Sequence, residues 1–392
     1  MTDPFQTPER QALRAMVTAF TEEHIVPNLP TWEADGHLPR ELHRRAAELG
    51  LLGLGFQEAI GGSGGDELDV VVMTEAMLEA GASGGLLSAL FTHGISLPHV
   101  IDEAKRRRDA GDVAGANHLQ EAIIAPVLRG EMILALAVTE PDGGSDVGNL
   151  TTRATEQSDG TWLVNGAKTY ITSGVRADRV VTAVRTGPGE GAAGLTLMLL
   201  DPSAEGYTPP KALAKMGWWC SDTAELAFQD VRVQSRDVFA IGGGFASLAQ
   251  HFITERLNMA VMGYATAQRC LDLTVDWAKN RRTFGRPLIS RQVIRHTLVE
   301  MHRRTDVARQ YARHVALQHT MQQATAIDAA FAKQTGVEAC AYVTNEAVQI
   351  HGGMGYMRES EVERHYRDAR ILGIGGGATE VMTDLSARLL GW

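Results

Sequence analysis

Residues 246–264 form the stretch ASLAQHFITERLNMAVMGY, whose apolar side chains recur at the spacing of an α-helix. The apolar residues on one stripe of this helix are Leu248, Phe252, Met259 and Met262. Glu255 falls on the same stripe. A carboxylate that faces an apolar interior resists ionisation, so we expect a raised pKa for Glu255. Such a group suits a base that takes a proton from carbon near neutral pH. The alternative is a structural glutamate paired with His251 or with an arginine.

Working outward from this stretch, the chain divides into a helical, a β and a second helical block. Helical spacing continues C-terminally through residues 246–280, 290–318 and 326–350. Before residue 244, apolar runs predict strands at residues 133–138, 178–186, 195–201 and 223–233. A tight hairpin is predicted where Trp162-Leu163-Val164 is followed by Asn165-Gly166 and residues 167–172. Asn-Gly favours the turn that twisted strands need.

The first third of the chain is predicted to be helical. Thr7 is an N-cap candidate before Pro8, and helical spacing recurs in residues 40–49 and 68–80, with a glycine-rich turn at 61–65. A doubly wound sheet would alternate strand and helix instead. We therefore expect an α+β multidomain chain. Its predicted parts are a helical domain at 1–133, a β-domain at 134–243 and a C-terminal helical domain at 244–392.

Composition is that of an ordinary globular protein, with 392 residues, 44% hydrophobic and 21% charged. The net charge of -10 argues against nonspecific nucleic-acid binding, and the basic run at 105–108 is flanked by acidic residues, which predicts a solvated helix face. No apolar run is long enough to span a bilayer, and the first ten residues contain no signal-peptide core.

Cysteine and histidine usage gives two further expectations. Cys220, Cys270 and Cys340 form no CxxC pair, and so sparse a set is typical of a reducing cytoplasm. The thirteen histidines form no HExxH motif and no His/Cys cluster, so no metal site is predicted.

Four segments have the composition of binding loops. They are VTEPDGGSDV at 138–147, YITSG at 170–174, RRTFGR at 281–286 followed by Gln292, and QIHGGMGY at 349–356. Glycines and hydroxyls let a backbone approach a flat ring or a phosphate, and arginines suit a pyrophosphate. Each segment alone has a structural explanation: an ordinary loop, a solvated helix end or a glycine C-cap.

Together these segments resemble the acyl-CoA dehydrogenase family over nearly the whole chain. The motifs that carry the resemblance, in the family's order, are VTEPDGGSDV, NGAKTYITSG, SDTAELAFQDVRV, RRTFG, QIHGGMGY and RDARI. The resemblance implies a middle domain like a β-barrel and a C-terminal four-helix bundle, with FAD held between them. It also implies a homotetramer, built as a dimer of dimers, that acts in fatty-acid β-oxidation.

By position, the resemblance places Val138, Thr139 and Ser145 beside the isoalloxazine ring of FAD, and Ser145 also near the CoA arm of the substrate. It places Tyr170 and Thr172 on the flanks of the same ring, where many relatives have tryptophan in place of Tyr170.

The same comparison assigns the remaining cofactor contacts to a neighbouring subunit. Arg281, Phe284 and Gln292 are placed at the FAD of the partner. Gln349 and Gly353 are placed at the adenosine and pyrophosphate part of that FAD.

The catalytic base departs from the commoner family pattern. Many members carry a glutamate in the loop after the RDARI-like segment, where this chain has Gly376. Glu380 is four residues further on and does not match. A smaller branch, which includes isovaleryl-CoA and long-chain acyl-CoA dehydrogenases, carries its glutamate at the position of Glu255. We therefore expect Glu255 as the base and Arg256 as an electrostatic support beside the substrate. We also expect empty volume at Gly376, which would tolerate branched acyl groups.

The implied reaction is the α,β-desaturation of an acyl-CoA thioester. Glu255 would take the pro-R α-proton while the β-hydrogen leaves as hydride to flavin N5, giving a trans-2-enoyl-CoA. A flavin ribityl hydroxyl and a backbone N–H near Gly376 would stabilise the enolate. An electron-transfer flavoprotein is the expected electron acceptor. The alternatives are an oxidase of the same fold and an inactive acyl-CoA-binding subunit.

Two stretches depart from the family pattern without a clear role. Trp218 and Trp219 stand where relatives often have an arginine or small residues, and they either fill a domain seam, which we favour, or line a substrate path. Residues 101–118 are longer and more charged than the usual loop, and an exposed helical insertion is favoured over a wall of the acyl tunnel.

Overall fold

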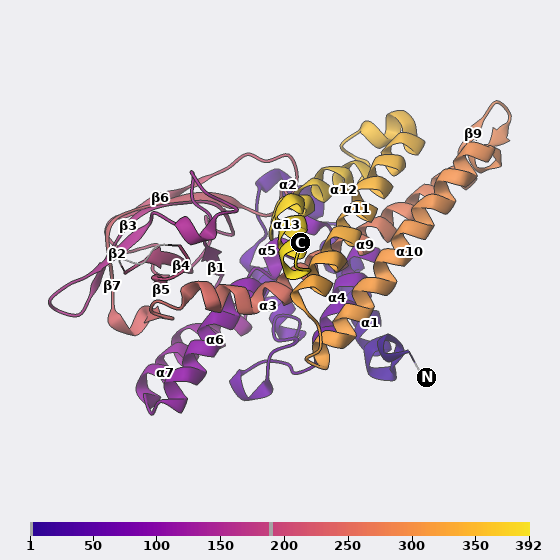
Figure 1. Ribbon diagram of the computed structural model, residues 1–392. Coiled ribbons are helices and arrows are strands. Elements are labelled where there is room, and N and C mark those ends of the chain that lie inside the picture. Colours follow the sequence, from indigo (N-terminus) through magenta and orange to yellow (C-terminus); the bar gives the residue numbers. More distant parts are fainter. Residues whose placement is uncertain (1–2, 188–190) are drawn as a thin grey trace.

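The computed structural model describes residues 3–187 and 191–392, which form a helical region, a sheet and a second helical region (Figure 1). The first region contains α1 (Pro8–Phe20), α2 (Leu29–Asp35), α3 (Arg40–Glu48), α4 (Glu67–Glu79), α5 (Gly84–Leu90), α6 (His93–Asp109), α7 (Val113–Leu119) and α8 (Ala125–Leu128). The sheet contains β1 (Leu134–Ala137), β2 (Arg153–Glu156), β3 (Trp162–Thr172), β4 (Arg179–Arg185), β5 (Leu195–Leu200), β6 (Tyr207–Ala212), β7 (Thr223–Val233) and β8 (Val238–Phe239).

Three long helices dominate the C-terminal region. They are α9 (Gly244–Asn280), α10 (Gln292–Thr320) and α11 (Ala326–His351), and the shorter α12 (Glu361–Ala369) and α13 (Thr379–Leu389) pack against α11. The two-residue strands β9 (Arg282–Thr283) and β10 (Arg286–Pro287) pair at the turn between α9 and α10, at the far tip of the bundle (Figure 1). The predicted α+β fold class and the helical C-terminal domain are thus confirmed.

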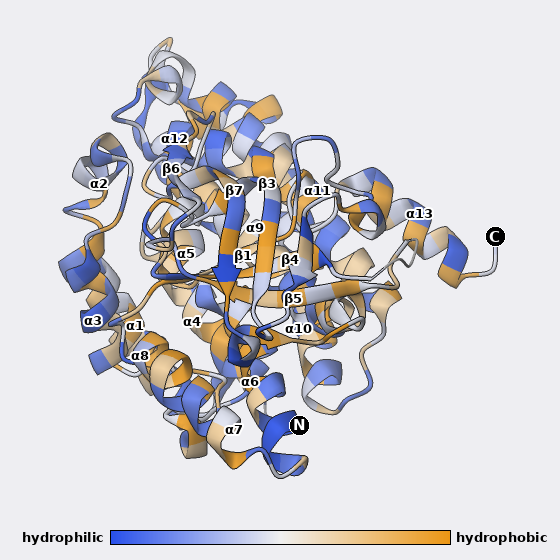
Figure 2. Cartoon of the chain, turned by 90° about the vertical axis from the view of Figure 1, so that its left-hand side faces the viewer, coloured by the Kyte–Doolittle hydropathy of each residue, from blue (hydrophilic) through white to orange (hydrophobic). Residues whose placement is uncertain are grey.

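The middle domain is an open sheet. Its strand order is β6-β7-β3-β2-β4-β5-β8, and β1 pairs with β4 in parallel. No pairing joins the end strands β6 and β8 within residues 3–187 and 191–392, so the barrel-like sheet does not close. Hydrophobic side chains line its interior, whereas an outer helix such as α3 carries mostly hydrophilic residues (blue in Figure 2).

The predicted hairpin at 162–172 is wrong, because β3 continues through Asn165 and Gly166 without a turn. Its pairing with β7 shifts register at this point, which marks a β-bulge. A side chain at position 166 would bring a Cβ within 2.6 Å of the Thr152 hydroxyl oxygen, so only glycine fits. The Asn165 side chain bonds Asp230 of β7 through two contacts of 2.9 Å. The Asn-Gly pair therefore shapes a bulge instead of ending a strand.

The charged stretch at 101–118 docks the first helical region onto the sheet. Arg107 is buried, donates to Glu103 at 2.7 Å, and donates to the carbonyl oxygens of Arg236 and Val238 at 2.8 and 3.0 Å. His118 contacts Asp237 at 3.1 Å. The expectation of a solvated basic face and an exposed insertion is therefore wrong for Arg107 and its partners, because they bond the end of the sheet.

A buried carboxylate ties the two helical regions together. Glu75 of α4 is fully buried and accepts hydrogen bonds from Tyr264 of α9 at 2.7 Å and from Arg313 of α10 at 2.9 and 2.7 Å. Arg14 of α1 completes the cluster. Burial raises the pKa of the Glu75 carboxyl, but the bonds and charge of Arg313 lower it further, so the net shift is downward.

Close contact between α9 and α11 depends on small residues. A Cβ at Gly263 of α9 would lie 2.7 Å from the carbonyl oxygen of Gly336, and a Cβ at Gly336 would lie 2.6 Å from that of Ala260. Any larger side chain at either position would push the two helices apart. None of the helices among the described residues is long and apolar enough to cross a membrane.

Replacing Glu75 by alanine is expected to lower the free energy of unfolding by about 3–5 kcal/mol, because Arg313 loses its buried partner. Tyr264→Phe removes a single hydrogen bond to the same carboxylate, and it should cost only about 1 kcal/mol. Urea denaturation followed by circular dichroism measures both. Equal midpoints for the two variants would show that Glu75 does not hold these helices together.

Candidate active site

Glu255 lies in the first half of α9 and is half-buried. Burial raises the pKa of its carboxyl, while the positive charges of Lys333 and Arg256 oppose the rise. The structural alternatives do not hold. His251 contacts Asp102 at 2.8 Å, and the Arg256 guanidinium lies 4.9 Å from the centre of the Phe252 ring. Glu255 itself has no hydrogen bond or ion pair to any described residue, so its carboxylate is available to a ligand.

Gly376 faces Glu255 from the loop between α12 and α13. A Cβ built on Gly376 would lie 3.2 Å from Oε1 of Glu255, so a side chain at position 376 would start beside this carboxylate. Gly376 has φ of +59°, which disfavours any other residue. The expected empty volume at Gly376 is wrong, because Sδ of Met259 lies 2.4 Å from that same Cβ position. Glu380 is exposed at the start of α13.

Lys333 of α11 binds the loop that contains Gly376. Its side chain is buried, and its ammonium donates to the carbonyl oxygens of Gly375 and Gly377. Burial lowers the pKa of Lys333 to about 8, the Glu255 charge opposes this, and Arg256 adds to it. Lys333 is not among the site residues predicted from the sequence. The signal was a lone lysine among small residues of a helix, in AAFAKQTG.

A second buried lysine joins two of the motif segments. Lys168 of β3 is fully buried and donates to Glu140 at 2.8 Å and to the Val138 carbonyl oxygen at 3.0 Å. Glu140 also accepts from Thr151 and Thr152 at 2.6–2.9 Å. Burial alone would raise the pKa of Glu140, but these donors lower it to about 2. The pair therefore clamps the loop after β1 to β3.

This clamp brings together most of the residues expected at a flavin ring. The Thr169 amide donates to the Thr139 carbonyl at 2.9 Å, which sets Val138 and Thr139 beside the end of β3. Tyr170 lies there with φ of +60° and 70% of its surface exposed. A left-handed tyrosine is an uncommon and strained backbone state, which is typical of functional positions. Thr172 ends the same strand.

Two further features connect this edge of the sheet with α9 and the solvent. Val138 packs in the same apolar cluster as Phe252, one turn before Glu255. Ser145 is exposed in the loop after β1. The first motif segment and the turn of α9 before Glu255 therefore pack against one apolar cluster.

The remaining expected cofactor residues gather at the opposite end of α9. The Trp277 and His351 rings stack at 5.0 Å and bring the end of α9 beside the end of α11. This end of the bundle carries Arg281, Phe284, Gln292, Gln349 and Gly353, all of them exposed. Phe284 is 97% exposed. An α-helix rises about 1.5 Å per residue, so the end of α9 lies about 38 Å from Glu255. The two groups cannot share one small contact region.

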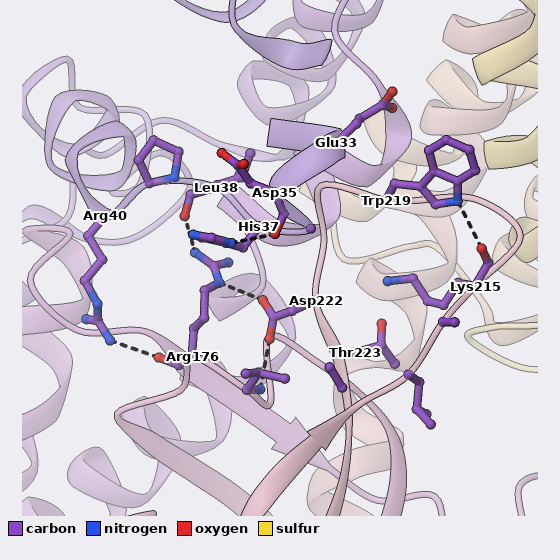
Figure 3. A pocket seen from close by; sticks show the side chains of 16 residues that line it. Glu33, Asp35, His37, Leu38, Arg40, Arg176, Lys215, Trp219, Asp222 and Thr223 are labelled. Carbon is purple, nitrogen blue, oxygen red and sulfur yellow. Dashed lines mark hydrogen bonds and ion pairs between the residues drawn. The ribbon is translucent and has the colours of Figure 1, made fainter. Parts of the chain in front are cut away.

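A pocket of about 700 Å³ lies elsewhere, between the α2–α3 loop and the loops that follow β3 and β6 (Figure 3). Arg176 and Asp222 pair across it at 2.6 Å, and Arg40 beside it bonds Asp178 at 2.8 Å. Neither Glu255 nor Gly376 lines it. This pocket is therefore separate from the surroundings of Glu255.

The tryptophan pair lies in a seam between elements. The Trp218 amide donates to the buried Asp368 at 2.6 Å, and a Cβ at Gly85 would lie 2.7 Å from the Trp218 Cα. The Trp219 ring packs against Arg358 and Arg367, whose guanidinium carbons are 4.1 and 3.6 Å from the ring centre. These contacts favour the seam over a substrate path.

Comparison with known proteins agrees with this geometry. Family models match three parts of the chain: the acyl-CoA dehydrogenase N-terminal domain at 7–105, the middle domain at 135–231 and the C-terminal domain at 242–391. A probable acyl-CoA dehydrogenase, YngJ of Bacillus subtilis (strain 168), is 32% identical, covering 98% of each chain. The mitochondrial long-chain specific acyl-CoA dehydrogenase of Mus musculus is 31% identical over 97% of this chain and 86% of the relative. A crystal structure of a putative acyl-CoA dehydrogenase from Mycobacterium smegmatis is 53% identical with a TM-score of 0.94, covering 99% of each chain.

Glu140→Gln is expected to destabilise the protein by about 3 kcal/mol at neutral pH, because Lys168 loses its buried partner. The folded pKa of about 2 lies below the usual value of 4.5, so the contribution of Glu140 is complete above pH 4.5 and is lost as pH falls towards 2. The difference in Tm between wild type and variant should therefore shrink between pH 5 and pH 3. A constant difference would contradict the assignment. Glu156→Gln, at an exposed carboxylate of the same domain that has no side-chain hydrogen bond or ion pair among the described residues, serves as the control.

Proposed function

The chain belongs to the acyl-CoA dehydrogenase family of oxidoreductases, and from that premise we propose that it is an FAD-dependent enzyme that converts an acyl-CoA thioester to a trans-2-enoyl-CoA, with Glu255 as base. One observation supports this most strongly. Oε1 of Glu255 lies 3.2 Å from the Cβ position of residue 376, where the commoner family pattern carries its glutamate. Two positions far apart in sequence thus deliver a carboxylate to one point.

The residues at the edge of the sheet fit a flavin ring. Val138 and Thr139 lie beside the end of β3, and Tyr170 is exposed in a strained conformation that turns it out of the strand. Thr139, Ser145 and Thr172 offer hydroxyls to a ring edge. FAD bound there would supply the electron sink that accepts the β-hydrogen with its electron pair.

The protein's part in the reaction is proton removal and charge stabilisation. Glu255 takes the α-proton of the thioester, and its raised pKa matches a base that works near neutral pH. Arg256 stands next to it and supports the charge. The amide N–H of Gly376 has no acceptor among the described residues, so it can donate to the thioester oxygen as negative charge develops. Ser145 contacts the CoA arm. Met259 and Phe252 exclude water on either side of Glu255.

The tip of the bundle serves a neighbouring copy of the chain. Arg281, Phe284 and Gln292 lie at the tip that follows α9, whose end is about 38 Å along the helix from Glu255, so we assign them to the FAD of a partner subunit. Gln349 and Gly353 contact its adenosine and pyrophosphate part. This arrangement requires at least a dimer, and a dimer of dimers satisfies it with closed symmetry.

The electron acceptor is an electron-transfer flavoprotein, and the enzyme belongs to the branch that carries its base on the helix. The position of Glu255, with Oε1 3.2 Å from the Gly376 Cβ position, supports that branch. We place the enzyme in the cytoplasm, in fatty-acid β-oxidation. A panel of straight, branched and cyclic acyl-CoAs, tested for bleaching of the flavin, would identify the substrate.

Glu255→Gln is expected to yield a yellow protein that binds acyl-CoA but bleaches at least about a hundredfold more slowly, because the general base is gone. Anaerobic stopped-flow absorbance measures the rate. Glu380→Gln, at the exposed carboxylate of α13, is the matched control and should bleach like wild type. Near-native bleaching by Glu255→Gln would exclude this glutamate as the base.

The same protein distinguishes the competing functions. Slow reaction of the reduced flavin with oxygen indicates a dehydrogenase, whereas rapid release of peroxide indicates an oxidase. A purified protein without flavin would indicate an acyl-CoA-binding subunit.

Subunit complementation tests the tip. Arg281→Ala removes a cofactor contact from the tip, and Glu255→Gln removes the base. If the tip serves the partner, a mixed dimer has one intact site, so equal co-expression should give about a quarter of wild-type activity on random pairing. Each variant alone should be nearly inactive. Arg303→Ala, exposed and away from the tip, should remain fully active. No activity in the mixed preparation would mean that the tip serves its own subunit.

A further inference from the structure

Lys333 is a buried cation without a carboxylate partner. Its side chain is only 2% exposed, and no ion pair joins it to any acidic group in the part of the chain that the structure describes. Its hydrogen bonds go to the backbone, to the carbonyl oxygens of Gly375 and Gly377. The charged groups that act on it, Glu255 and Arg256, both belong to α9. Burying a lysine costs free energy, so its placement under a loop of three glycines calls for a functional reason.

The loop above Lys333 is held at both ends by other contacts. The amides of Ile374 and Gly375 donate to the Ile371 carbonyl at 2.9 and 2.8 Å. On the other side, Gln334 donates to the Thr379 carbonyl at 3.2 Å and to the Thr383 hydroxyl at 2.8 Å. The loop would therefore stay attached to α11 without Lys333. What Lys333 adds is the orientation of the peptide units in the middle of the loop.

Peptide geometry connects Lys333 to Gly376. The carbonyl of Gly375 and the N–H of Gly376 belong to one trans peptide unit, so they point in opposite directions. Because the Lys333 ammonium binds the carbonyl oxygen, it turns the N–H to the opposite side of the loop. Glu255 of α9 faces this loop, with its Oε1 3.2 Å from the Gly376 Cβ position. The N–H has no acceptor among the described residues and is free to donate to a ligand there.

We propose that Lys333 is a positioning residue that orients and polarises the Gly375–Gly376 peptide, so that its N–H stabilises the enolate which Glu255 generates. A peptide whose carbonyl oxygen binds a cation is a stronger N–H donor, because hydrogen bonds in a chain polarise one another. The positive charge below the loop also favours negative charge on the thioester oxygen above it. This inference rests on the proposed dehydrogenation, and it adds a group that touches neither substrate nor cofactor.

The test measures enolate stability at equilibrium instead of turnover. A 3-thiaacyl-CoA carries sulfur in place of the β-carbon, so its α-proton can leave but it has no β-hydrogen to transfer. Its enolate, stacked on oxidised flavin, gives a long-wavelength charge-transfer band. Titrating this band against pH in the flavin-loaded enzyme gives the apparent pKa of the bound thioester.

In Lys333→Met, this apparent pKa should rise by about one unit, a tenfold loss of enolate. In Lys333→Gln, which keeps a hydrogen-bond donor but no charge, the apparent pKa should rise by less. This variant tests the proposal if Lys333→Met fails to fold. Gln334→Met is the matched control. It breaks the neighbouring tie between α11 and the same loop, and it should leave the apparent pKa unchanged.

Backbone amide exchange gives a second measurement that does not depend on turnover. Peptides that span residues 373–378 should exchange faster in Lys333→Met than in wild type. An unchanged apparent pKa in the flavin-loaded Lys333 variants would overturn the proposal, and so would an equal shift in Gln334→Met. If wild type shows no charge-transfer band at any pH, the proposed dehydrogenation itself fails, and this inference fails with it.

Discussion

The buried carboxylate of Glu75 fixes the position of α9, and the proposed chemistry depends on that position. Glu75 is fully buried, and it binds Tyr264 of α9 and Arg313 of α10. A charged group in such a place tolerates little displacement, because any broken contact leaves an unpaired charge. Tyr264 lies nine residues after Glu255 on one continuous helix, so the same contact fixes how far Glu255 reaches towards the sheet.

The second constraint is the close approach of α9 to α11. Gly263 and Gly336 let the two backbones approach closely. This close approach brings Lys333 of α11 near enough to interact electrostatically with Glu255. Alanines surround Lys333 on its own helix, so space below the glycine loop is available for a long side chain. Small residues thus have an electrostatic consequence here, because they set the distance between Glu255 and Lys333.

The sequence predicted what depends on local periodicity. The helices around Glu255 and the strands at 179–185, 195–200 and 223–233 follow from apolar spacing. The strand at 207–212 was missed because it contains Pro209 and Pro210, which are tolerated only because this strand lies at the sheet edge. The hairpin predicted from Asn165-Gly166 is wrong for a different reason. The conformation of this pair depends on contacts with Thr152 and Asp230, which lie in other segments of the chain.

Lys333 could not be assigned a role from sequence, because its partners are backbone carbonyls, and a carbonyl has no sequence signature. Glu255 was easier to propose as a site residue, since its neighbours on the helix are themselves apolar. The ion pair between Glu140 and Lys168 was equally hard to predict, because nothing in the sequence shows that two single charges in separate segments are in contact. Long-range pairing of isolated charges therefore marks the limit of what periodicity can predict.

The placement of the proposed base on a helix has a steric consequence for the loop. A glutamate at position 376 would compete with Glu255 for the same volume, and Met259 already occupies part of it. The two positions are therefore mutually exclusive, and glycine at 376 follows from glutamate at 255. Because residues 376 and 377 are glycines, the loop can adopt left-handed conformations at both positions. Lys333 then binds the loop through its carbonyl oxygens. In the proposed mechanism, proton removal and enolate stabilisation belong to two separate elements, the helix α9 and the glycine loop.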